Sequence, residues 1–303
     1  MKIPREFNSF GGAVCAGTML LLGARINVQA QYNYTTLSVP GAEYTEAYGI
    51  SGNNIVGFYN STSGAYGFLY NGSSYTSLPL IGGEYTPFAD SISGNNIVGS
   101  YSSETGAGFL YNGSSYTTLS VPGASQTWAY GISGNNIVGW YDNESGSQGF
   151  LYNGSTYTTL SVPGAAHTYA EGIDGNNVVG YYDNGGSEQG FLYNGSTYTT
   201  LNVPGAESTW IYGISGNNIV GYYDNGSSEQ GFLYNGSTYT TLNVPGATYT
   251  YAQGIDGNNV VGYYGDSTGD MYGFLATPTT APEPSALAAV GVATWLIRRQ
   301  RIR

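Results

Sequence analysis

The chain has 303 residues, and only 9% of them are Asp, Glu, Lys or Arg, against about 25% in an average soluble domain. Gly (48 residues) and Tyr (31 residues) are over-used, and the surplus of turn-forming and β-favouring residues over Leu, Lys and Glu indicates an all-β protein. All seven basic residues lie within 2–25 and 298–303, whereas 17 of the 19 acidic residues lie between Glu43 and Asp270. Because phosphate backbones are bound through Lys and Arg, this body excludes nucleic acid as a partner.

Residues 1–30 have the features of a secretory signal peptide. Lys2 and Arg5 form a basic start, an apolar run follows, and Ala30 ends a stretch of small residues suitable for cleavage. The only cysteine, Cys15, lies inside this segment, and the discarded-signal interpretation is favoured over a lipid-attachment site. The mature body therefore has no cysteine, and its stability must come from burial and backbone pairing rather than from disulfides.

Residues 31–277 consist of repeats of one unit. The string GISGNNIVG or a close variant occurs six times at steps of 40 to 42 residues, and the triplet GFL follows the same period. In the unit 210–242, four runs rich in Ile, Val, Tyr, Phe and Thr are separated by Gly/Asn turns, which predicts a four-stranded antiparallel sheet. The fourth connection is longer and contains a proline, so it is predicted to join the outer strand of one sheet to the inner strand of the next.

The repeat count predicts a closed ring. The motif YTTL or its variant occurs once before the first YGIS motif and does not follow the last GFL triplet, so the sixth unit lacks its own outer strand. Residues 34–37 can supply that strand and remove two exposed sheet edges. The fold class predicted is thus an all-β, six-bladed β-propeller of ~41-residue four-stranded repeats, closed by an N-terminal outer strand.

Strand alternation predicts how the inner strands face. In the fifth unit, Trp210, Tyr212 and Ile214 are expected on one side of the inner strand, and Ile211 and Gly213 on the other. Large residues on one side and small ones on the other would let neighbouring sheets interdigitate near the axis.

The elements "GI.G...VGYY" and "GFLY" resemble the HAF family of bacterial extracellular repeats over about residues 34–277. This chain has Gln-Gly-Phe-Leu where that family usually has His-Ala-Phe-Leu. The resemblance implies an extracellular repeat protein without assigned catalysis.

Aromatic residues give the strongest candidate for ligand recognition. They occupy, in five of six units, the position three before the residue that opens the repeated string, which is Gly except for Ser91 in the second unit: Phe88, Trp128, Tyr169, Trp210 and Tyr251. Rings at repeated sites on one rim could stack on sugars. The alternative, which is favoured, is that they pack blade against blade.

Catalytic chemistry has little support in the sequence. The single histidine, His167, lies in an inter-blade link where the other units carry Tyr, Gln or Ser, and no Ser or Cys triad forms around it. Glu171 and Asp174 are the best carboxylate pair for a glycosidase, but three residues apart on a strand they face opposite ways. The protein is therefore predicted not to be an enzyme.

No cofactor is predicted. A zinc site of His and Cys ligands is not available in the mature body. Asp142, Asp183 and Asp224 begin Asp-Asn-rich hairpins whose oxygens would suit calcium, although turn chemistry alone explains those residues and is favoured.

Residues 278–303 form a linker and a sorting or anchor segment. Pro282, Glu283 and Pro284 precede a short apolar run, 285–297, which predicts a short C-terminal apolar helix, and a cluster beginning with Arg298 and Arg299 follows. The run is shorter than the roughly 20 residues that span a membrane. This order of features resembles the PEP-CTERM sorting signal of Gram-negative bacteria. The resemblance implies recognition by a membrane-embedded exosortase, attachment to the membrane before processing, and delivery to the cell surface or extracellular matrix.

The function predicted is that of a non-enzymatic, exported surface or matrix protein associated with exopolysaccharide. A multivalent, lectin-like carbohydrate-binding propeller is the alternative, and a carboxylate glycosidase is third. The sequence leaves open the ligand, calcium dependence, processing of the C-terminal segment and the oligomeric state.

Overall fold

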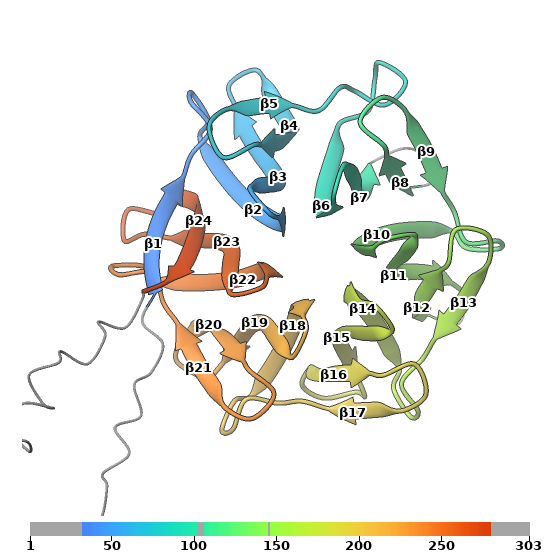
Figure 1. Cartoon of the computed structure of the whole chain (residues 1–303). Coiled ribbons are helices and arrows are strands. Elements are labelled where there is room, and N and C mark those ends of the chain that lie inside the picture. Colours follow the sequence, from blue (N-terminus) through green and yellow to red (C-terminus); the bar gives the residue numbers. More distant parts are fainter. Residues whose placement is uncertain (1–31, 102–105, 145, 280–303) are drawn as a thin grey trace, which may run out of the picture.

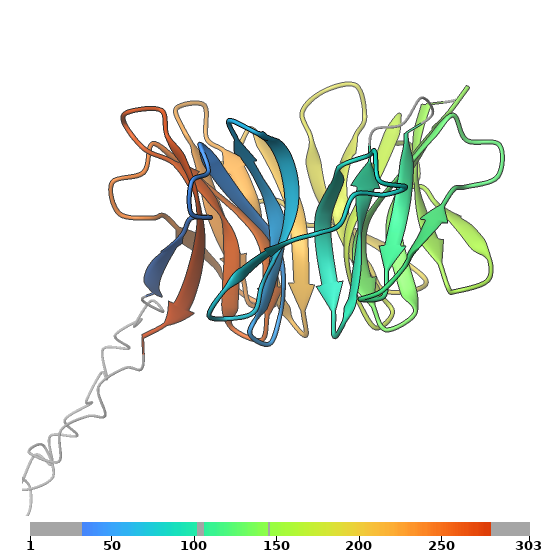
Figure 2. The same cartoon turned by 90° about the horizontal axis from the view of Figure 1, so that it is seen from above.

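The computed structural model describes residues 32–101, 106–144 and 146–279, which form six four-stranded antiparallel sheets arranged as blades around a central axis (Figure 1). The predicted six-bladed β-propeller is confirmed. In Figure 2 the strands run roughly along the axis of the ring. The signal-peptide site Ala30, the sorting motif with its arginines, and the predicted C-terminal helix lie outside the described residues.

Each blade is built from the axis outwards in the predicted order of motifs. The inner strands are β2 (Tyr44–Ser51), β6 (Pro87–Ser93), β10 (Gln126–Ser133), β14 (His167–Asp174), β18 (Ser208–Ser215) and β22 (Tyr249–Asp256). The second strands are β3 (Asn54–Ser61), β7 (Asn96–Tyr101), β11 (Asn136–Asn143), β15 (Asn177–Asp183), β19 (Asn218–Asp224) and β23 (Asn259–Gly265). The third strands are β4 (Gly64–Tyr70), β8 (Ala107–Tyr111), β12 (Gly146–Tyr152), β16 (Gln189–Tyr193), β20 (Glu229–Tyr234) and β24 (Met271–Pro278). The outer strands are β5 (Tyr75–Ser77), β9 (Tyr116–Leu119), β13 (Tyr157–Leu160), β17 (Tyr198–Thr200), β21 (Tyr239–Leu242) and β1 (Tyr32–Leu37).

The N-terminal strand closes the ring, as predicted. Blades 1 to 5 take their strands in chain order from β2–β5 to β18–β21, and blade 6 combines β22–β24 with β1. β1 lies beside β24 (Figure 1), and in their antiparallel ladder Tyr34 pairs with Ala276 and Leu37 with Gly273. Leu37 is 3% exposed and packs with the core of blade 1, so β1 fastens the last blade to the first.

The cores lie between successive blades. The phenylalanine of each GFL motif is almost completely buried: Phe68, Phe109, Phe150, Phe191, Phe232 and Phe274. Each core cluster also contains a second-strand valine from the preceding blade, as Val98 of blade 2 packs with Ile137 and Phe150 of blade 3. Each blade therefore supplies part of its neighbour's core, so closing the ring buries apolar surface and stabilises the folded state.

A β-bulge interrupts every inner strand at the same place. In blade 5, Ile211 pairs with Gly221 and Gly213 with Val220, so Tyr212 is the extra residue without a partner. The other five blades have the same register shift. The predicted strict alternation is therefore wrong at this point: Ile211 and Ile214 pack in one core cluster, because the bulge resets which side each following residue faces.

A ring of side-chain hydrogen bonds joins the blades at the ends of the inner strands. The last residue of each inner strand, Ser or Asp, accepts a hydrogen bond of 2.6–3.4 Å from the backbone N–H of the glycine in the next inner hairpin. The six acceptors are Ser51, Ser93, Ser133, Asp174, Ser215 and Asp256. This end of the channel is thus held together by hydrogen bonds between neighbouring blades.

The described part of the chain contains no helix long and apolar enough to cross a membrane.

Candidate functional site in the central channel

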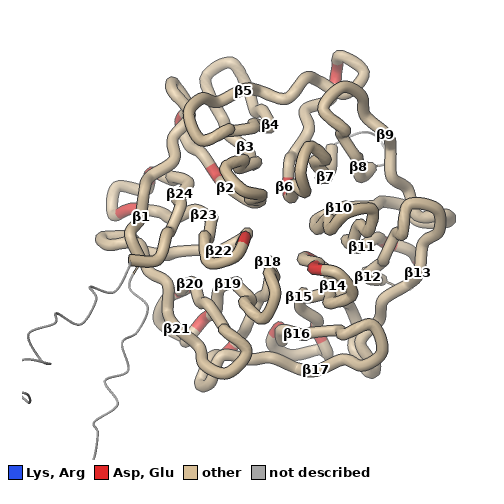
Figure 3. Tube along the Cα trace, viewed as in Figure 1, with Lys and Arg blue, Asp and Glu red and all other residues tan. Residues whose placement is uncertain are grey.

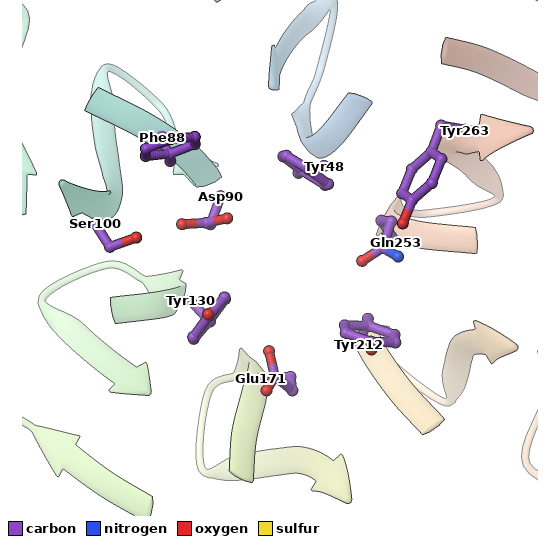
Figure 4. Close-up of a pocket in the computed structure, with 9 residues that line it drawn as sticks. All are labelled: Tyr48, Phe88, Asp90, Ser100, Tyr130, Glu171, Tyr212, Gln253 and Tyr263. Carbon is purple, nitrogen blue, oxygen red and sulfur yellow. The ribbon is translucent and has the colours of Figure 1, made fainter. Parts of the chain in front are cut away.

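The six bulge residues point into the channel at the centre of the ring (Figure 4). They are Tyr48, Asp90, Tyr130, Glu171, Tyr212 and Gln253. A bulge turns its extra side chain out of the pleated alternation, which is why these large polar residues face the axis while their neighbours pack between blades. A cavity of about 280 Å³ lies on the strand-start side of this layer, and a narrower one of about 80 Å³ continues along the axis.

A belt of aromatic side chains surrounds the strand-start end of the channel. It is formed by one residue of each inner strand, two positions before the bulge residue, and by the residue that pairs with it on the second strand. The paired positions are Glu46 and Phe58, Phe88 and Ser100, Trp128 and Trp140, Tyr169 and Tyr181, Trp210 and Tyr222, and Tyr251 and Tyr263. Every residue of this aromatic belt is aromatic except Glu46 and Ser100.

Ring packing accounts for four of the five predicted recognition residues. The ring centroids of Trp128 and Trp140 lie 3.9 Å apart, and Tyr169, Trp210 and Tyr251 lie 4.8–5.1 Å from their second-strand partners. Ring contacts also join neighbouring blades, between Trp140 and Tyr169 and between Tyr222 and Tyr251. These half-buried rings hold the belt together, which agrees with the alternative of blade-to-blade packing.

Phe88 differs from the other four, because it lines the cavity. Its register partner is Ser100, so no second-strand ring fills the space that Trp140, Tyr181 or Tyr222 fills elsewhere. Phe88 stacks instead on Phe58 of the preceding blade, with ring centroids 4.7 Å apart. Ser100, Phe88 and Tyr263 wall the 280 Å³ cavity, and the bulge residues form its floor (Figure 4).

Two carboxyl groups lie on that floor, from blades 2 and 4. Glu171 is 4% exposed and makes no side-chain hydrogen bond within the described residues, and Oδ2 of Asp90 is inaccessible and has no hydrogen-bond partner there. Burial raises the pKa of Asp90 well above its usual range. Burial, and then the repulsion of Asp90, raise the pKa of Glu171 in the same way.

The tyrosines of the floor stay protonated. Burial raises the pKa of Tyr48, Tyr130 and Tyr212 well above the ordinary value, and nearby carboxylates act in the same direction. Tyr130 lies between Asp90 and Glu171 and interacts electrostatically with both. The floor therefore offers hydroxyl and amide donors beside two acidic groups, all backed by aromatic faces.

Glu171 and Asp174 are not brought together. Glu171 faces the channel, whereas Oδ2 of Asp174 accepts a 2.7 Å hydrogen bond from the Gly216 N–H in the ring of inter-blade bonds. The carboxyl group that shares the channel with Glu171 is Asp90.

The hairpin aspartates are engaged in turns. Oδ1 of Asp142 accepts from the Ser147 hydroxyl, and Oδ1 of Asp183 and of Asp224 accept from backbone N–H groups two residues on. Among the described residues, no group of three or more His, Cys, Asp or Glu side chains could hold a metal ion.

His167 begins β14, where its Nδ1 accepts a 3.2 Å hydrogen bond from the Ser147 backbone N–H of the preceding blade. It lies outside the residues that line the channel cavity.

The sequence contained a signal for Ser100 and Asp90, which the sequence analysis did not name as site residues, and for their link with Glu171. Ser100 is the one non-aromatic residue among the six copies of its second-strand position. Asp90 and Glu171 are the two carboxylates at the position before the Gly, or Ser in the second unit, that opens the repeated string. Two departures from the repeat in the same small region mark an asymmetric site. The bulge that brings the Asp90 position to the axis was not visible in the alternation pattern.

No family model matches the sequence, and no curated protein matches it. Among solved structures, the β-propeller domain of the Trilobed protease from Pyrococcus furiosus, described as having an open velcro topology, is similar at 9% identity and a TM-score of 0.47, covering 80% of this chain and 97% of that one. The acylaminoacyl peptidase of Pyrococcus horikoshii is similar at 9% identity and a TM-score of 0.47, covering 82% of this chain and 54% of that one. These likenesses concern the fold alone.

Proposed function

We propose that the protein is a non-enzymatic, exported surface or matrix protein whose propeller binds a glycan at the aromatic-belt end of its central channel. The observation that carries the binding role is the gap at Ser100, which leaves a cavity of about 280 Å³ walled by Phe88 and Tyr263. This volume is near the lower end of the range for small-molecule sites, so the site suits one terminal sugar unit.

The chemistry of the cavity supports a sugar. Aromatic faces stack on the apolar faces of sugar rings, and the hydroxyls of Tyr48, Tyr130 and Tyr212 with the Gln253 amide can pair with sugar hydroxyls. In the other described blades an aromatic ring fills the space equivalent to Ser100. We therefore propose one site per propeller in place of the repeated rim sites predicted from the sequence.

The export role rests on the two terminal segments of the sequence. A signal-peptide pattern at one end and a resemblance to a PEP-CTERM signal at the other imply processing by an exosortase and attachment to the exopolysaccharide layer. Detection of the protein in the extracellular fraction, shortened at both ends, is the expected result. Recovery of an intact chain from the cytoplasm would contradict this part of the proposal.

The binding role is tested by filling the gap. Purified protein is applied to a glycan array and to the exopolysaccharide of the producing bacterium, with and without calcium, as wild type and as Ser100→Tyr. Tyr occupies the equivalent position in blades 4, 5 and 6, so the variant is expected to fold and to lose binding. Ser155→Tyr, in an exposed turn between β12 and β13 on the opposite face, is the matched control and should bind normally.

Binding that survives in Ser100→Tyr would exclude the cavity as the site. Absence of binding to any glycan by the wild-type protein would overturn the carbohydrate role. A requirement for calcium would show that a cation takes part in binding, which the proposed cavity site does not need.

A further inference from the structure

The floor of the cavity contains two acidic groups with no compensating charge. Residues 31–297 contain no Lys or Arg, so no basic side chain of the propeller can neutralise Asp90 or Glu171 (Figure 3). Three more carboxylates lie around the belt: Glu46, which accepts a hydrogen bond from the Tyr48 hydroxyl, Glu188 and Glu229. The one histidine, His167, stacks on Tyr169 of the belt with ring centroids 6.3 Å apart, and it does not line the cavity. Any cation at this site must therefore come from outside the propeller.

Both carboxyl groups are short of hydrogen bonds. Oδ2 of Asp90 is buried without a partner, and Glu171, which is 4% exposed, accepts no side-chain hydrogen bond from a described residue. An inaccessible acid oxygen without a donor, as Oδ2 of Asp90 is, is costly because it has lost its water and gained no hydrogen bond. Both groups line the same cavity, so one ligand can reach both (Figure 4).

An ammonium group matches this arrangement better than a metal ion or a neutral hydroxyl. It has three N–H donors and one positive charge, enough for two carboxylates and one further acceptor such as the Tyr130 hydroxyl. The surrounding rings of Tyr48, Tyr130 and Tyr212 add an attraction for an organic cation. Two carboxylates are too few for a calcium site, which takes six to eight oxygen ligands.

We propose that the ligand carries a protonated primary amine, and that its ammonium group lies between the carboxylates of Asp90 and Glu171. The inference deepens the proposed glycan site, on which it rests: the terminal sugar is an amino sugar with a free amine. A free polyamine offers the same ammonium chemistry, and the test separates the two sources.

Proton release accompanies this binding. In the empty channel the two carboxyl groups retain protons to a higher pH than usual, and the ammonium group binds their ionised forms. Binding therefore expels protons to solvent, and affinity increases as pH rises until the amine itself loses its proton.

The test is calorimetric titration of the purified full chain at pH 7 with three probes: a glucosamine tetramer, its fully N-acetylated form and putrescine. The glucosamine tetramer is expected to bind at least tenfold more tightly than the acetylated form, because acetylation removes the charge. Titration in two buffers of different ionisation enthalpy should record net proton release.

Substitutions test whether the carboxylates of Glu171 and Asp90 bind the ammonium group. Glu171→Gln and Asp90→Asn should each weaken glucosamine-tetramer binding at least tenfold and reduce the proton release. Gln already occupies the same bulge position in blade 6, at Gln253, so Glu171→Gln should fold. Asp174→Ser removes a carboxylate three residues away that lies outside the cavity, and it should leave the affinity unchanged.

Each outcome decides one of the two proposals. Equal or tighter binding of the acetylated tetramer would overturn the amine inference and leave the glycan site standing. Putrescine binding with neither tetramer bound would support a cation site and contradict the glycan. Binding of the amine without proton release, or unaffected by both substitutions, would overturn the placement between Asp90 and Glu171.

Discussion

The backbone N–H of Gly52 donates a 2.6 Å hydrogen bond to Oδ2 of Asp256, which joins the inner strand of the last blade to the first inner hairpin of the ring. The same bond recurs at every other blade junction with Ser or Asp as the acceptor. Together with the pairing of β1 and β24, it closes the propeller at two radii, near the axis and at the outer edge.

Removing the acceptor at the first-to-last junction should weaken the ring. Asp256→Ala is expected to lower the free energy of unfolding by about 1–2 kcal/mol, because a charge-assisted hydrogen bond is lost. Asp256→Ser restores the acceptor used at four other junctions and should lose less. Urea denaturation of both variants measures the difference, and equal losses for Ala and Ser would refute a hydrogen-bonding role.

Much of the fold could be predicted because the sequence repeats. The order of four strands in each blade followed from turn residues, and the N-terminal strand followed from the offset of the YTTL motif. The bulge could not be predicted, because its signal is an unpaired residue such as Tyr212 that looks like an ordinary member of an alternating strand.

The site was only partly predicted, because its geometry depends on how the strands and blades are placed in space. The aromatic positions were found, but sequence spacing cannot distinguish a ring that packs, such as Trp128, from one that lines a cavity, such as Phe88. The proximity of Asp90 and Glu171 depends on ring closure, which brings blades 2 and 4 to one axis. Spacing along the chain offered only the pair Glu171 and Asp174, which were expected to face opposite ways and do so in the fold.

The N-terminal strand should contribute as much as any other outer strand. Leu37→Ala is expected to lower the free energy of unfolding by about 3 kcal/mol, because Leu37 is 3% exposed and its truncation leaves a cavity between blades 6 and 1. Leu242→Ala, at the equivalent place in blade 5, is the matched comparison. Denaturation should give similar losses, whereas a negligible loss for Leu37→Ala alone would mean that β1 is a loosely attached tail.

The second-strand glycine opposite each bulge should not tolerate a side chain. A Cβ atom added to Gly139 would collide with the carbonyl oxygen of Trp128 and with the ring of Phe150, so Gly139→Ala is expected to cost about 3 kcal/mol. Gly186→Ala is the control, because its Cβ would meet only the Asn184 side chain at 3.6 Å. Thermal denaturation checks both variants, and an unaffected Gly139→Ala would contradict the close approach of β10 and β11.

The channel carboxyls should make the stability of the propeller depend on pH. Because burial raises the pKa of Glu171, the folded state holds a proton that the unfolded state has already released. Folding is therefore favoured below the unfolded pKa near 4, and this contribution is lost as pH rises through the folded value. The wild-type free energy of unfolding should fall with rising pH, by as much as ~1.4 kcal/mol per pH unit for one proton.

In the Glu171→Gln variant the free energy of unfolding should depend less steeply on pH than in the wild type. The variant should therefore gain more stability over the wild type at pH 8 than at pH 5, as measured by urea denaturation from pH 5 to pH 9. Asp174→Ser, which also removes one negative charge, should keep the wild-type slope; if both variants flatten it equally, the slope arises from the general charge of the body and not from the buried carboxyl.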